Sequence, residues 1–154
     1  MARSEWLWII GIVAAAVIGI VGRAYIYHRA QSRKECRDGI ERITSLIHSI
    51  SEIAMDYYGR HCTDPECPKL ARQITSRLKE VGHRATRFNI DLPTQGLMIA
   101  VVRFRQAVSD ELDSQSRTPC PLGDPALNAI HANGQTIVIR LETAYQRKYG
   151  GMLW

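Results

Sequence analysis

The residues best suited to chemistry are one histidine and three cysteines, in two polar segments that lie far apart in the sequence. His61, Cys62 and Cys67 fall between residues 60 and 68, and Cys120 falls in a second polar segment. Three thiolates and one imidazole form a ligand set that binds zinc tetrahedrally. The second segment lacks the paired Cys-x-x-Cys or His of most zinc sites, so two alternatives stay open. They are a disulfide from Cys62 to Cys67 or Cys120, and reduced loop thiols.

No familiar catalytic motif accompanies these residues. The chain has no Gly-x-x-x-x-Gly-Lys phosphate loop, no His-Glu-x-x-His pair, no Gly-x-Ser-x-Gly elbow and no dinucleotide fingerprint. His28, His83 and His131 have no carboxylate or thiol nearby in the sequence that would make an acid–base pair. We therefore expect a protein that is not an enzyme and that uses no cofactor, with zinc at the cysteines as the one exception.

The composition indicates what kind of fold must position the cysteines. The chain has 154 residues, of which 45% are apolar and 23% charged, as in one ordinary globular domain. Aromatic residues make up only 7%, and runs of β-branched residues are few, which favours helices over a β-sandwich. We expect an all-α fold in which a single N-terminal transmembrane helix continues into a small antiparallel bundle of about four helices.

The N-terminal segment from Trp6 to Gly22 contains no charged residue. At about 1.5 Å per residue it extends for about 25 Å, close to the thickness of a bilayer's hydrocarbon core. Trp6 and Trp8 at one end, with Tyr25 and Tyr27 at the other, match the aromatic residues that flank membrane spans. The sequence predicts a retained span, because a cleaved signal peptide has a shorter apolar region and a more basic start.

A basic stretch follows this segment directly, with only Glu35 opposing its five cations, which are Arg23, Arg29, Arg33, Lys34 and Arg37. Each cation near a membrane surface gains about 1 kcal/mol from anionic headgroups. Only Arg3 precedes the span, so the positive-inside rule places the C-terminal domain in the cytoplasm, at a bacterial inner membrane. A periplasmic domain is the alternative, and disulfides would favour it because the cytosol keeps thiols reduced.

Three small residues in the apolar segment share one helix face. Gly11, Ala15 and Gly19 fall four residues apart, a spacing that lets two helix backbones approach closely in lipid. Self-association through this face is one hypothesis. The alternative is that Gly and Ala are simply common in membrane helices.

The soluble part begins with a long amphipathic helix that ends at Gly59. Its apolar residues alternate in steps of three and four and form one stripe, made of Ile40, Ile43, Ile47, Ile50, Ala54 and Tyr57. We expect this helix to continue from the apolar segment without a break. A coiled-coil dimer is the alternative. It is opposed by Arg29 and Arg33, which continue the same stripe and would repel their counterparts in a second copy.

Three further helices are predicted from the same kind of spacing. The second begins near Asp64 or Cys67 and reaches about Phe88, and the third runs from Leu97 to about Asp113. The last begins at the pair Asp124-Pro125 and stops at Gly150-Gly151, with Asn133-Gly134 as a weak point where a kink or a short strand from Thr136 to Leu141 competes. The acidic end of the third helix, which is Asp110, Glu111 and Asp113, is expected to pair with the basic second helix.

These elements predict four parts of the chain. Residues 1–27 form the tail and transmembrane anchor, 28–37 the basic juxtamembrane stalk, 38–151 the helical bundle and 152–154 the C-terminal tail. An up-down-up-down order gathers His61, Cys62, Cys67 and Cys120 at the end of the bundle far from the membrane, and returns Trp154 to the membrane interface.

The leading functional hypothesis is a single-pass membrane protein whose bundle acts as a non-enzymatic interaction or scaffold module. Its expected partners are membrane lipids and an unidentified protein, with a second copy of itself as a further candidate. Nucleic acid is not expected, since the basic second helix lacks interleaved aromatic residues. A membrane-tethered metal or redox sensor is one alternative, and a small membrane effector of a toxin or phage-defence type is the other.

Overall fold

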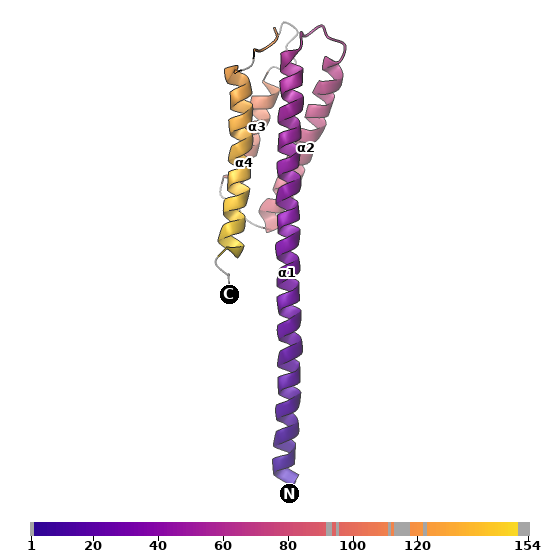
Figure 1. Cartoon of the computed structure of the whole chain (residues 1–154), viewed down its shortest axis with the longest axis vertical. Helices are drawn as coiled ribbons and strands as arrows, with labels where there is room; N and C mark the ends of the chain where they lie inside the picture. Colours follow the sequence, from indigo (N-terminus) through magenta and orange to yellow (C-terminus); the bar gives the residue numbers. More distant parts are fainter. Residues whose placement is uncertain are drawn as a thin grey trace. The chain divides into compact units, whose positions relative to one another are not determined.

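The fold is all-α. The computed structural model describes residues 2–91, 94, 96–110, 112, 118–121 and 123–150, and of residues 2–7, 9, 10, 12, 90 and 91 it describes the backbone alone. Within these ranges it contains four helices and no strand. They are α1 (Ala2–Gly59), α2 (Cys67–Asp91), α3 (Leu97–Ser109) and α4 (Pro125–Tyr149), drawn in Figure 1. The expected small helical bundle is confirmed.

The chain divides into two compact units, Met1–Cys36 and Arg37–Trp154. The first unit is the N-terminal part of α1, in which every residue from 13 to 28 is exposed. In the part of the chain that the structure describes, no helix has a stretch both long and apolar enough to cross a membrane. Five residues of the predicted span lie outside the described side chains, namely Trp6, Leu7, Ile9, Ile10 and Ile12.

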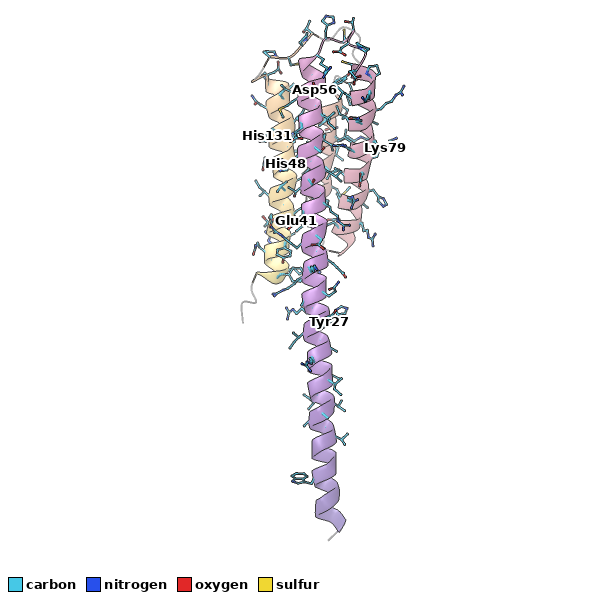
Figure 2. The ribbon with its side chains drawn as sticks, turned by 45° about the vertical axis from the view of Figure 1, so that its right-hand side comes forward. Tyr27, Glu41, His48, Asp56, Lys79 and His131 are labelled. Carbon is cyan, nitrogen blue, oxygen red and sulfur yellow. The ribbon has the colours of Figure 1, made fainter. Side chains whose placement is uncertain are left out.

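The second unit is the bundle, and its core contains most of the residues at the three-and-four helical spacing, together with others such as Tyr58 and Tyr149 that the spacing did not single out. All six members of the predicted stripe on α1 are buried. So are Ile74, Leu78 and Val81 on α2, Leu97, Val101, Phe104 and Val108 on α3, and Ile130, Ile137 and Leu141 on α4. In both views α2 and α4 lie on either side of the second part of α1 (Figures 1 and 2). Removing these apolar side chains from water is the main force that holds the unit together.

Gly134 does not interrupt α4. The expected weak point is wrong, as is the competing short strand, because the helix runs unbroken from Pro125 to Tyr149. Gly134 is buried, and a Cβ placed on it would lie 2.9 Å from Ile47 Cγ2 and 3.3 Å from Phe104 Cε2. Its missing side chain therefore lets α4 approach α1 and α3 closely, and the tight packing keeps the glycine helical.

Local sequence signals set the start of α4. Asp124 precedes the helix with extended backbone angles, and its carboxylate accepts a hydrogen bond from the Ala126 amide at 2.8 Å. Pro125 follows, at a position where no backbone N–H is needed. The predicted Asp124-Pro125 start is thus confirmed with its physical cause, an N-cap.

The end of α3 differs from the prediction by one turn, since the helix stops at Ser109 and not near Asp113. Tyr58 Oη donates a hydrogen bond to the Val108 carbonyl at 2.7 Å, and Tyr57 Oη donates one to the Leu112 carbonyl at 2.6 Å. The last carbonyls of a helix have no partner within the helix. Here the Tyr58 hydroxyl supplies a partner for the Val108 carbonyl in the last turn, and the Tyr57 hydroxyl binds the chain beyond the helix at Leu112.

Candidate functional site

The residues with reactive side chains meet at one end of the bundle, which we call the cysteine end and define by His61, Cys62, Cys67 and Cys120. The Cys120 amide donates a hydrogen bond to the Tyr58 carbonyl in the last turn of α1, at 2.9 Å. This bond ties the loop before α4 to the end of α1. The two segments that the sequence places far apart therefore share one end of the fold, as the alternating helix order predicts.

Two interactions of the cysteine side chains are between neighbours in the sequence. The Cys62 Sγ lies 3.8 Å from His61 Nδ1, and Cys67 Sγ donates to the His61 carbonyl at 3.4 Å. Cys67 is buried, whereas Cys62 and Cys120 are partly exposed. All four cysteines of the chain are thiols. Among the described residues, no three or more His, Cys, Asp or Glu side chains gather closely enough to hold a metal ion.

A charged turn leads from the cysteine end into α2. The Asp64 carboxylate accepts a hydrogen bond from the Glu66 amide at 2.8 Å and another from Arg60 Nη1 at 3.3 Å. The amide bond is the largest cause that lowers the pKa of Asp64, and the Arg60 guanidinium adds to it. Hydrogen bonds to the charged form favour that form. Asp64 therefore fixes the turn as a carboxylate.

The predicted headgroup-binding cations have different surroundings. Arg23 and Lys34 are exposed, while Arg29, Arg33 and Arg37 are partly buried. All five lie on α1, and their contact with lipid stays a prediction.

Arg37 has a role within the bundle that the sequence did not reveal. Its Nη1 donates to both carboxylate oxygens of Glu142 on α4, at 2.8 and 2.9 Å, and its Nε donates to Glu41 at 3.2 Å. The guanidinium also lies over the Tyr145 ring, 5.8 Å from the ring centre. The charge of Glu142 is the largest cause that raises the pKa of Arg37. Arg37 joins α1 to α4 across 105 positions of sequence, a separation that leaves no local signal.

The predicted membrane-contact residues that the structure describes are exposed. Trp8, Tyr25 and Tyr27 present most of their surface to the surroundings. Gly11, Ala15 and Gly19 are exposed as well, and a Cβ added at either glycine would meet no atom within 4 Å. The Trp6 side chain and Trp154 lie outside the described residues. Membrane contact and helix pairing stay predictions for these positions.

The expected pairing of α2 with the acidic end of α3 is not seen among the described residues. The described ion pairs of α2 are both local, from Lys69 to Glu66 and from Arg84 to Glu80. Asp110 is exposed, and Glu111 and Asp113 lie outside the described residues. Much of the basic surface of α2 thus faces the surroundings.

A shallow groove of about 400 Å³ lies between α1 and α2. Its lining combines Leu46 with charged groups of both signs, among them Asp38, Arg42, Glu80 and Arg84.

Comparison of the chain with family models, with curated proteins and with solved structures found no match.

Proposed function

We propose that the protein is a single-pass membrane protein whose helical bundle serves as a non-enzymatic interaction or scaffold module at the membrane. The observation that carries the proposal is the surface of α1 between residues 6 and 22. This segment has no charged residue, and its described apolar side chains are exposed, including Val13, Val17, Ile18, Ile20 and Val21. Apolar surface left in water costs about 25 cal/mol per Å². A hydrocarbon environment removes that cost.

The cations that follow the segment support the orientation. Arg23, Arg29, Arg33 and Lys34 come within twelve residues of Gly22, whereas Arg3 is the only basic residue before Trp6. This asymmetry favours a cytoplasmic bundle, with a periplasmic bundle as the alternative outcome. The proposed partners are membrane lipids and protein.

Vesicle flotation of the full chain tests the anchor. We expect the wild-type protein to float with phosphatidylcholine vesicles, and the Val17→Arg/Val21→Arg variant to stay at the bottom of the gradient. An arginine near the centre of a span, as at Val17, costs about 2.5–3.5 kcal/mol, and one nearer the end, as at Val21, costs less. Met55→Arg/Ile139→Arg is the matched control, because Met55 and Ile139 are exposed apolar residues of the bundle. A wild-type chain that fails to float, or a Val17→Arg/Val21→Arg variant that floats as well as the control, contradicts the proposal.

The side of the membrane is tested with a variant that keeps Cys62 as its single cysteine. Cys62 is partly exposed, so a maleimide can reach it. In spheroplasts we expect a membrane-impermeant maleimide to label this thiol only after the membrane is permeabilised. Labelling of intact spheroplasts would place the bundle in the periplasm.

A further inference from the structure

The second part of α1 carries a row of exposed polar side chains that includes four carboxylates. The row, which we call the acidic row, consists of Asp38, Glu41, Ser45, His48, Glu52 and Asp56. Successive members are three or four residues apart, so they share one helix face. That face lies opposite the buried isoleucines of the same helix. At about 1.5 Å per residue the row is about 27 Å long.

Helix α2 carries a row of opposite charge with identical spacing. This basic row consists of Lys69, Arg72, Ser76, Lys79, His83 and Arg87, all exposed. In both rows the successive steps are three, four, three, four and four residues. Figure 2 shows Glu41, His48 and Asp56 along α1 and Lys79 on the outer side of α2.

Few of these charged side chains form ion pairs within the chain. The members that form described ion pairs do so with neighbours in sequence, as Glu41 does with Arg37, Asp56 with Arg60, and Lys69 with Glu66. In the described ranges no ion pair involves the remaining charged members, which are Asp38, Glu52, Arg72, Lys79 and Arg87. A single charged row is usually just a solvated face. Two rows of opposite sign and equal spacing on neighbouring helices are complementary to each other.

We infer that two copies of the bundle pair through these rows, with the acidic row of each copy on the basic row of the other. A two-fold axis makes such an interface self-complementary, because the same surface is used by both copies. α1 and α2 run in opposite directions within one bundle (Figure 1). An axis parallel to the helices therefore sets α1 of one copy antiparallel to α2 of its partner. The same axis keeps the two bundles parallel, with Asp38 of both copies at the same end, as the proposed anchoring in one membrane requires, so this arrangement rests on the proposed function.

The positions of the charges along the bundle axis fit this arrangement. A Cβ placed on Gly39 would lie 3.8 Å from Phe88 Cδ2, so Asp38 and Arg87 lie near the same end of the two helices. The short loop from Arg60 to Glu66 brings Asp56 and Lys69 to the other end. Rotation about an axis parallel to the helices leaves the position of each residue along the bundle unchanged. Carboxylates at each end of one row therefore meet cations at the same end of the other.

The pairing is expected to be weak between bundles in solution and effective between anchored copies. Exposed ion pairs contribute little individually, and salt screens them. Confinement to one membrane raises the effective concentration of each surface for the other. Three members of the acidic row, Asp38, Glu41 and Ser45, line the α1–α2 groove, and Leu46 gives it an apolar element that a partner would cover.

Charge reversal with exchange tests the inference. Full chains carrying a donor or an acceptor fluorophore at the C-terminus are placed in phosphatidylcholine vesicles, and energy transfer between copies is measured. The acidic-row variant is Asp38→Lys/Glu52→Lys, and the basic-row variant is Arg72→Glu/Arg87→Glu. Each reversal replaces several attractions by repulsions in a two-fold pair, so we expect each variant alone to associate at least ~10-fold more weakly. A mixture of the two variants should recover the wild-type energy transfer, because every reversed row then meets an opposite one.

Three matched measurements accompany this experiment. The Arg103→Glu/Arg105→Glu variant reverses two exposed charges of α3 outside both rows, and it should pair like the wild type. Circular dichroism should show the same helix content for all variants. High salt should lower the energy transfer of the wild type.

The inference is overturned if the wild type shows no energy transfer, if a reversed variant pairs like the wild type, or if the mixture fails to recover the signal. A basic row that binds anionic lipid instead would increase flotation with anionic vesicles and leave no transfer in neutral ones, which also overturns it. Failure of the anchor is distinguishable, because flotation reports it separately. In that case sedimentation equilibrium of the full chain at high concentration measures the pairing directly.

Discussion

The two parts of α1 place the same residue type in opposite environments. Ile18, Ile20 and Ile26 expose 72%, 70% and 69% of their surface, whereas Ile40, Ile43 and Ile50 expose 1%, 2% and 0%. All of them belong to one helix, so helix propensity does not explain the difference. In the second part the apolar residues recur on one stripe, which α2, α3 and α4 can cover, and polar rows take the outer face. In the first part apolar residues occupy every face.

This contrast supports the proposal that the two parts of the helix have different surroundings. A stripe that segregates apolar from polar residues is the pattern of a helix between a protein core and water. A segment that is apolar on all faces is the pattern of a helix surrounded by apolar material. The contrast is therefore what the proposed membrane anchor at residues 6–22 and a bundle in water would produce.

The largest expected effect is on the buried side of the comparison. Ile50→Ala removes a fully buried side chain and should cost about 2–5 kcal/mol of unfolding free energy. Ile18→Ala is the matched change on the exposed side and should alter that free energy by less than about 0.5 kcal/mol. The midpoint of urea unfolding of the bundle, followed in detergent, measures both. Equal losses in the two variants would show that the two parts of α1 do not differ as described.

A pair of glycine variants sharpens the comparison inside the bundle. Gly134→Ala sets a methyl group against Ile47 and Phe104, at a packing cost of about 1–3 kcal/mol, which a helix-propensity gain of about 1 kcal/mol partly offsets. We therefore expect a net loss of about 1 kcal/mol. Gly82→Ala, in α2, meets no atom within 4 Å and should gain about 0.5–1 kcal/mol. Thermal unfolding measures both, and a stabilising Gly134→Ala would refute the close approach of α4 to its neighbours.

The next effect concerns the start of α4. Asp124→Ala removes the N-cap bond to the Ala126 amide and should cost about 1 kcal/mol. Asp110→Ala is the control, because Asp110 is an exposed aspartate at the C-terminal end of α3, where it caps no backbone amide of a helix start. The two urea midpoints should differ. Similar midpoints would mean that the cap contributes little to the bundle.

The smallest effect is a dependence on pH. The Glu66 amide, with help from Arg60, lowers the pKa of Asp64 in the folded chain. Its contribution to stability is therefore complete above the pKa of the unfolded chain and is lost as the pH falls through the lower, folded pKa. The Asp64→Asn variant should lose less stability on acidification than the wild type. Urea midpoints at neutral and acidic pH provide the measurement, and identical pH profiles would contradict this role of Asp64.

The helices and the core were predictable because their signals are local. The three-and-four spacing from Ile40 to Tyr57 identifies the buried face of α1 without knowledge of the other helices. Asp124 and Pro125 mark the start of α4 through the chemistry of the helix end itself.

The features that the sequence did not predict depend on contacts between distant residues. The end of α3 depends on hydroxyl groups from Tyr57 and Tyr58, which lie 55 and 50 residues away. Gly134 is helical because Ile47 and Phe104 surround it, whereas glycine alone predicts a break. Arg37 looks like one more basic residue of the stalk until its contact with Glu142 is seen.

The candidate sites were predictable only as locations. The helix order brought His61, Cys62, Cys67 and Cys120 to one end, but spacing in sequence does not fix the distances that metal binding needs. The complementary rows were present in the sequence as exposed positions of two helical patterns. The apolar stripe identifies only the buried face of each helix, so it does not predict them.

Alkaline carbonate extraction of native membranes that contain the full chain tests the proposed membrane span most directly. This treatment releases proteins held at the surface by charge and leaves proteins whose apolar segments cross the bilayer. We predict that the protein stays in the membrane pellet, and that Val17→Arg/Val21→Arg moves it to the supernatant. Release of the wild-type protein into the supernatant would contradict a span between Trp6 and Gly22.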